Sequence, residues 1–382
     1  MRSAVPVRLA VGLVLALTPA TASSATVPGS WRRLPTAPLA PDAGAAGVWT
    51  GGRLLVVGSA SVRSEDGAVL AARNVAATYD PAARRWRTLP RPPGNARATG
   101  GPYAAAWTGT EALVWRAGTH AAYAPATGRW RTLPRPPADT TGLVVWTGAE
   151  LVGWGGGCCG DAFANGVAYA PSRNAWRRLA PSPLAPSQHP TGAWTGTELI
   201  IVVGDRDPEG RPWPASLARA AAYDPAADRW RRIAAPPGTR TAASAVWDGR
   251  ERRPGAGRPT DEQQLARVGL AYDPATDAWR RLAAMPAGRL GAAAVTGGSG
   301  VLVWGGSSQA GQYTMPAHGL AYDPAANRWD DLPPAPVLGR VDPIAVWTGR
   351  RLLVWGGTDP YHPYADGAEF LPVRLDQPSS RS

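Results

Sequence analysis

The apolar residues of this chain fall into short runs that are separated by Gly, Pro, Asp and Thr. The run Leu-Ile-Ile-Val-Val at 199–203 is typical, because it is continuous, largely β-branched and bounded by turn residues. Such runs favour buried strands over helices. No stretch after residue 25 keeps an apolar period of 3.6 residues, so the pattern predicts an all-β protein.

A repeat of about 50 residues organises these strands. Its most regular feature is a Trp-x-x-Leu or Trp-x-x-Ile element at Trp31, Trp86, Trp130, Trp176, Trp230, Trp279 and Trp329. Tyr-Asp-Pro or Tyr-Ala-Pro precedes six of these tryptophans, and a Trp-Thr-Gly or Trp-Asp-Gly turn usually follows them. An aliphatic run that ends in glycines comes next, as at 301–306 and 352–357. Each repeat therefore predicts four short strands joined by turns.

The repeat resembles the kelch family. The resemblance is carried by the aliphatic-Gly-Gly pair, the Tyr-Asp-Pro turn, the strand tryptophan and the trailing Leu-Pro-x-x-Pro, and it extends over about residues 31–371. It implies a kelch-type β-propeller of seven four-stranded blades, a fold that serves unrelated functions. The last set of strands (344–347, 352–355 and 368–371) has no tryptophan strand after it. We expect the N-terminal strand at Trp31 to complete that blade and to close the ring.

One repeat departs from the pattern. After Trp247-Asp248-Gly249, where the other repeats carry aliphatic residues, residues 250–259 contain four arginines and two prolines. Because proline lacks the N–H that a sheet ladder needs, we expect no central strand there. The segment 250–264 is either a true loop that leaves a three-stranded blade or a compensated shift of the reading frame, which the nucleotide sequence would decide.

Composition limits the class of protein. Among the 382 residues, 18 tryptophans and a hydrophobic content of 44% argue against disorder, and two cysteines exclude a disulfide scaffold. Residues 1–25 have basic residues, a short apolar run and small residues, which is typical of a secretory signal peptide. We expect a secreted, extracellular protein with no membrane span, one propeller domain over 26–374 and a polar tail at 375–382.

The net charge of +12 comes from arginine alone, and many of the arginines recur after the strand tryptophans. Such spacing distributes charge around the molecule, whereas nucleic-acid-binding proteins concentrate it on one face. We therefore expect no nucleic-acid partner. The expected partner is a protein or glycan at the cell surface or outside the cell, bound by a monomer.

Topology limits where a binding site lies. The Trp-Thr-Gly and Asp-Pro-Ala turns are uniform and share one face, whereas the other connections vary in length and share the opposite face, where we expect function. These variable connections are 59–73, 90–102, 134–141, 157–165, 180–191, 204–217, 306–317, 334–343 and 357–366. As an exposed aromatic and arginine patch for ligand binding they offer Trp213, Tyr313, Arg340, Tyr361, His362 and Tyr364.

Cys158 and Cys159 follow three glycines in the connection 157–165. In a secreted protein we expect them to form a disulfide between adjacent residues that stiffens the loop; a reduced pair and a redox or metal role are the alternatives.

The propeller is also distantly similar to the central domain of galactose oxidase. Copper radical oxidases of that type use a Tyr-His pair, a further His, and a Tyr linked to a Cys. This chain has Tyr361-His362 together with His120, His189 and His318, but its cysteines are adjacent and no second ligand tyrosine can be named. We therefore expect a non-catalytic module that binds a glycan, small ligand or protein on the variable-loop face, with no catalytic residues, metal or cofactor. The alternative is an enzyme on the same scaffold, either a copper radical oxidase or a sugar-active hydrolase or isomerase.

Overall fold

A computed structural model describes residues 27–42, 44–63, 69–96, 102–138, 140, 142–157, 160–204, 207, 211–237, 245–247, 252–254, 268–298, 300–308 and 314–373. The expected signal peptide and C-terminal tail lie outside the described residues, as do Cys158, Cys159 and Tyr313.

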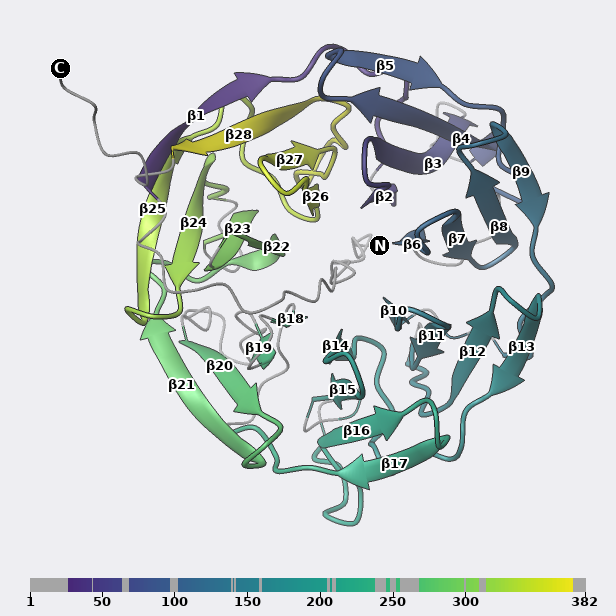
Figure 1. Ribbon diagram of the computed structural model, residues 1–382, viewed down its shortest axis with the longest axis vertical. Coiled ribbons are helices and arrows are strands. Elements are labelled where there is room, and N and C mark those ends of the chain that lie inside the picture. The colour runs from purple at the N-terminus through teal and green to yellow at the C-terminus, as the bar shows by residue number, and fades with distance from the viewer. Residues whose placement is uncertain are drawn as a thin grey trace, which may run out of the picture.

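The described residues form a β-propeller, with seven four-stranded antiparallel sheets arranged in a ring (Figure 1). Blade 1 consists of β2 (Ala46–Trp49), β3 (Leu54–Arg63), β4 (Val69–Asp80) and β5 (Arg85–Thr88). Blade 2 consists of β6 (Ala104–Trp107), β7 (Ala112–Arg116), β8 (Thr119–Ala124) and β9 (Arg129–Thr132). Blade 3 consists of β10 (Leu143–Trp146), β11 (Leu151–Trp154), β12 (Gly166–Ala170) and β13 (Ala175–Arg178).

The remaining blades repeat this order. Blade 4 consists of β14 (Thr191–Trp194), β15 (Leu199–Val202), β16 (Ala220–Asp224) and β17 (Arg229–Arg232). Blade 5 consists of β18 (Ala245–Trp247), β19 (Arg252–Pro254), β20 (Val268–Asp273) and β21 (Ala278–Ala284). Blade 6 consists of β22 (Leu290–Gly297), β23 (Gly300–Ser307), β24 (His318–Asp323) and β25 (Arg328–Pro334). Blade 7 consists of β26 (Ile344–Trp347), β27 (Leu352–Trp355), β28 (Gly367–Val373) and β1 (Val27–Arg33).

The N-terminal strand closes the ring, as the sequence predicts. β1 pairs with β28 in antiparallel register, with Trp31 opposite Phe370 and Arg33 opposite Ala368. Both β1 and β28 lie on the outside of blade 7 in Figure 1, while β26 lies near the centre.

One hydrogen bond recurs at every junction between blades. The indole N–H of each strand tryptophan donates to a backbone carbonyl four residues after the preceding strand tryptophan. The pairs are Trp86 with Pro35, Trp130 with Pro90, Trp176 with Pro134, Trp230 with Ala180, Trp279 with Ala234, Trp329 with Ala283 and Trp31 with Pro333, at 2.7 to 3.0 Å. All seven tryptophans are partly buried, because each indole contacts the neighbouring blade.

The core consists of the second and third strands. Every described side chain of β15 is buried, and Trp154, Trp304 and Trp355 are almost fully buried in other second strands. Apolar clusters cross from blade to blade; one of them joins Trp304 of blade 6 to Val354 and Phe370 of blade 7. The blades therefore stabilise one another. Within the described residues no helix is long and apolar enough to cross a membrane.

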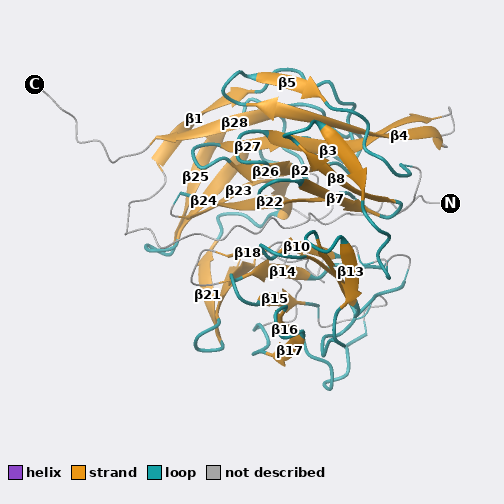
Figure 2. Cartoon of the chain, turned by 45° about the vertical axis from the view of Figure 1, so that its right-hand side comes forward, coloured by secondary structure: helices purple, strands orange, loops and turns teal. Residues whose placement is uncertain are grey.

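Two details of the sequence prediction are wrong. Residues 252–254 form β19, a central strand, so blade 5 has four strands. Pro254 is tolerated because it ends the strand opposite Ala245, while the ladder to β20 consists of the single pair Arg252–Tyr272. The connection expected at 59–73 is largely strand, because β3 and β4 continue as a long hairpin that extends away from the ring in Figure 2.

Candidate functional site

Two faces of the propeller differ in the way the sequence predicts. The turn face carries the uniform connections, such as Thr108–Glu111 and Thr348–Arg351, each closed by the same hydrogen bond from the threonine N–H. The variable-loop face carries the connections between second and third strands and between blades. On that face, blade 7 brings together residues 334–343 and 356–366, which are linked by paired hydrogen bonds between Val341 and Thr358.

Glycine allows these two connections to meet. Gly357 has a φ of +89°, and a Cβ on it would lie 2.7 Å from the carbonyl oxygen of Val341. Any other residue would be strained in conformation and would push the two segments apart. Gly357, one of the glycines that end the aliphatic run, thus has a structural role, because it allows the two connections to lie side by side beneath the site.

Arg340 is the base of the site. Its side chain is only 1% exposed, its Nη1 donates to Asp366 Oδ1 at 2.7 Å, and its guanidinium lies 4.1 Å from the ring centre of Tyr364. Nε donates to the carbonyl oxygen of Leu338 at 2.8 Å. The stacked and paired guanidinium therefore fixes Tyr364 from below.

Asp359 organises the outer part of the loop. Its Oδ1 accepts hydrogen bonds from the backbone N–H groups of Tyr361 and His362 at 2.7 and 2.6 Å, and its Oδ2 accepts one from the Tyr364 hydroxyl at 2.6 Å. Burial opposes ionisation of Asp359, but these hydrogen bonds outweigh it and lower the pKa of its carboxyl. The hydrogen bond to Asp359 raises the pKa of Tyr364, so at neutral pH the pair is a carboxylate and a protonated phenol.

This loop holds two side chains out to solvent. Tyr361 is 78% exposed, one of few large apolar side chains exposed in the described part of the chain, and the His362 side chain is 77% exposed. Leu338, which is 66% exposed, lies on the adjoining connection. The site is thus an exposed aromatic and imidazole pair on a backbone fixed from beneath.

The structure brings together four of the six predicted binding residues: Arg340, Tyr361, His362 and Tyr364. Arg340 was expected to be part of an exposed patch, and that expectation is wrong, since it is buried under Tyr364 and holds the loop. The sequence also places Trp213 on this patch, and this too is wrong: Trp213 belongs to blade 4 and is partly buried against a core cluster that contains Leu184 and Ala218. Asp359 was not selected from the sequence, although its place two residues before Tyr361 is the pattern of a side chain that caps a turn.

The donor set expected for copper does not gather here. Within the described residues no three His, Cys, Asp or Glu side chains lie close enough together to hold a metal ion. His120 lies within β8 of blade 2 and His318 at the start of β24 in blade 6, while His362 lies 3.7 Å from Asp359 in blade 7. The described histidines are therefore not gathered with other His, Cys, Asp or Glu side chains into a group that could hold copper.

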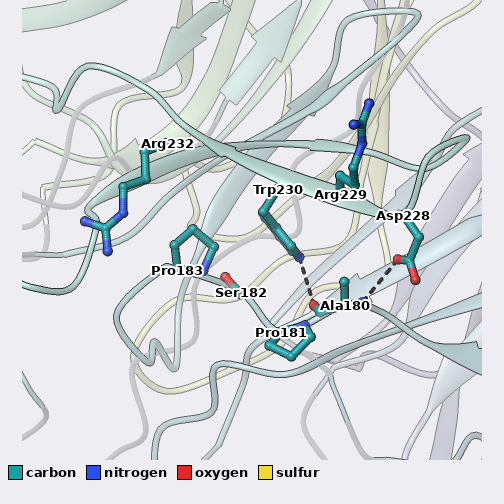
Figure 3. Close-up of a pocket in the computed structure, with 8 residues that line it drawn as sticks. All are labelled: Ala180, Pro181, Ser182, Pro183, Asp228, Arg229, Trp230 and Arg232. Carbon is teal, nitrogen blue, oxygen red and sulfur yellow. Dashed lines mark hydrogen bonds between the residues drawn. The ribbon is translucent and has the colours of Figure 1, made fainter.

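A shallow cavity of about 490 Å³ lies at the rim between blades 3 and 4 (Figure 3). Its lining residues are Ala180, Pro181, Ser182, Pro183, Asp228, Arg229, Trp230 and Arg232. Trp230 donates to the Ala180 carbonyl there, and Asp228 accepts from the Ala180 N–H at 3.1 Å, as the dashed lines show. These contacts belong to the junction that recurs around the ring, so the cavity is part of the scaffold.

Comparison with known proteins supports the fold. The chain is similar in structure to a fungal alcohol oxidase of the AA5 family, solved in complex with copper, with a TM-score of 0.69. The two are 15% identical, and the similarity covers 90% of this chain and 76% of that one. No protein-family model matches the sequence, and no curated protein matches it. At 15% identity, this similarity shows that both chains share a β-propeller fold. The resemblance to kelch repeats rests on the repeat residues alone.

Proposed function

We propose that the chain is a secreted, non-catalytic binding module that holds a glycan on the variable-loop face of blade 7. One observation carries the proposal: the Tyr361 ring is 78% exposed on a loop whose backbone is held by Asp359. An exposed aromatic ring on a fixed backbone loses little conformational entropy when a ligand covers it.

A carbohydrate suits this arrangement. The face of a tyrosine ring packs against the C–H face of a sugar, and its hydroxyl remains available to hydrogen-bond the sugar hydroxyls. The exposed His362 imidazole beside it offers a donor and an acceptor when neutral. Recognition through one aromatic ring and a few polar groups predicts a modest affinity that depends on Tyr361.

The electrostatics favour binding over catalysis. A general base needs a free acceptor and a pKa near the working pH. Asp359 is the central carboxylate of the site, yet its oxygens already accept three hydrogen bonds and its pKa is lowered. It is therefore a positioning residue for Tyr361 and Tyr364.

The proposal is tested by passing the purified chain over a panel of immobilised neutral oligosaccharides, with the metal content of the same sample measured. We expect at least one sugar to bind the chain, no binding by Tyr361→Ala, and unchanged binding by Leu371→Ala, which removes an exposed apolar side chain from β28. Failure of every sugar to bind would overturn the proposal. Stoichiometric copper with oxidation of an alcohol would instead establish the enzyme alternative, which the likeness to the copper alcohol oxidase favours.

A further inference from the structure

A cluster of arginines lies on the opposite side of the molecule, on the turn face where blade 7 meets blade 1. At its centre is Glu369, whose side chain is fully buried. Its Oε1 accepts from Arg32 Nε and Arg84 Nη1, both at 2.7 Å, and its Oε2 accepts from Arg351 Nη1 at 2.8 Å. Three guanidiniums thus share one carboxylate, which leaves a charge of +2.

Blades 2 and 4 balance the charge at the equivalent position with one carboxylate for one arginine. In blades 2 and 4 the turn between the first two strands carries Glu111 and Glu198, each of which pairs with one arginine of the outer strand at 2.7 and 2.8 Å. In blade 7 the equivalent turn residue is Arg351, and the carboxylate that pairs with it, Glu369, lies on β28. Compared with blades 2 and 4, the closure therefore carries an excess of positive charge.

Further arginines surround the closure. Arg85 and Arg350 are exposed, adjoin Arg84 and Arg351 in the chain, and form no ion pair with any described residue. Arg53 lies 3.5 Å from Asp80 on the neighbouring turn. We name Arg32, Arg53, Arg84, Arg85, Arg350 and Arg351 the closure patch. Ion pairs join four of these arginines to two carboxylates, Asp80 and Glu369, so the six arginines and two carboxylates together carry a net charge of +4.

We infer that the closure patch binds an anionic polysaccharide. A guanidinium presents a planar fork of donors that matches carboxylate and sulfate groups, and Glu369 holds three of these forks in place before any ligand arrives. The six arginines are spread over three turns and the strands β1 and β5, so the patch suits repeated charges along a polymer more than one small anion. Binding there would leave the variable-loop face of blade 7 free.

The test uses the full chain and dextran sulfate, with uncharged dextran and carboxylated dextran as further probes. The variant Arg85→Ser/Arg350→Ser removes the two unpaired arginines and spares the contacts of Glu369. The control Arg129→Ser/Arg229→Ser removes the same charge; Arg129 and Arg229 hold the place of Arg85, directly before the strand tryptophan, in blades 2 and 4.

We expect dextran sulfate to bind with an affinity that falls steeply between about 50 and 300 mM salt. Arg85→Ser/Arg350→Ser should weaken binding about tenfold and the control less than twofold, with carboxylated dextran showing the same order. Equal losses in both variants would assign the binding to the overall charge and overturn the inference. Absence of binding to either anionic dextran, or tighter binding to duplex DNA than to both, would also overturn it. Because Tyr361 lies on the other face, Tyr361→Ala should bind dextran sulfate normally, which separates this result from the proposed function.

Discussion

The indole nitrogen of Trp31 donates a hydrogen bond to the carbonyl oxygen of Pro333 at 2.8 Å, across 302 residues of chain. The same ring lies 5.1 Å from Phe370 and 6.1 Å from Trp304. Trp31 is therefore the member of the seven-fold set of indole contacts that turns an open series of blades into a ring, and it removes the edge that an open series would expose.

Trp31→Ala should lower the free energy of unfolding by about 2–4 kcal/mol, below the full range for a buried tryptophan because the ring is only half-buried. Trp31→Phe keeps most of the packing and loses the indole donor, and should cost about 1 kcal/mol. Urea denaturation measures both. A loss below about 0.5 kcal/mol for the alanine variant would mean that β1 does not close the ring.

Glu369 gives a second test of the closure. Glu369→Gln removes the buried negative charge and leaves three guanidiniums facing a neutral amide, which should cost about 3–5 kcal/mol. Glu198→Gln is the matched control, because Glu198 pairs with Arg231 at a half-exposed position and should cost less than about 1 kcal/mol. Urea denaturation measures both variants. Similar losses of stability would show that Glu369 does not stabilise the ring closure more than an ordinary ion pair does.

The junctions between blades should be sensitive to acid. Burial raises the pKa of Asp228, but hydrogen bonds from the Tyr223 hydroxyl, the Ala180 N–H and Arg177 outweigh it and lower that pKa below the ordinary value. A lowered folded-state pKa stabilises the fold fully above the ordinary aspartate pKa of about 4, and this stabilisation is lost as the pH falls through the folded-state pKa. The melting temperature of Asp228→Asn should therefore change less than that of the natural chain between about pH 5 and 2. Parallel curves would exclude Asp228 as a source of acid sensitivity.

The Asp359 turn should control the order of the site. In Asp359→Ala the amide hydrogens of Tyr361 and His362 lose their acceptor, and hydrogen exchange at these two positions should accelerate at least tenfold. Asp224→Ala is the control, because Asp224 accepts from Ala226 and Ala227 in a similar turn at 2.9 and 3.2 Å in blade 4. Its effect should stay in that turn. Unchanged exchange at Tyr361 in Asp359→Ala would show that the loop is held by other contacts.

The repeat predicts most of this fold because each blade uses the same residues for the same contacts. β27, for example, lies at Leu352–Trp355 as expected. A short aliphatic run between a turn and two glycines buries its side chains by forming a strand inside the blade. β19 was missed because the ladder around it, and not its own composition, holds its three residues. The sequence does carry a signal for the buried ion pairs of the closure, because Glu369 is a charged residue between Ala368 and Phe370 in a strand that is otherwise apolar.

The candidate site was predicted only in part, for a similar reason. Tyr361-His362 stands out in the sequence, whereas the burial of Arg340 depends on Tyr364 and Asp366, which lie 24 and 26 residues further along the chain. A local pattern cannot distinguish an arginine that contacts a ligand from one that supports the loop beneath it. Trp213 packs against a core cluster whose members come from several strands and from the connection at Leu184 and Ala185, and its neighbours in the sequence do not show this.

The most direct test of the binding site is a calorimetric titration of the natural chain, Tyr361→Ala and Phe163→Ala with the oligosaccharide that binds best. Phe163 is the matched control, because it is an exposed aromatic residue on the variable-loop face of blade 3. We expect at least a tenfold loss of affinity for Tyr361→Ala, with the melting temperature unchanged, and less than a twofold change for Phe163→Ala. Equal affinity of the natural chain and Tyr361→Ala would exclude Tyr361 from the binding site.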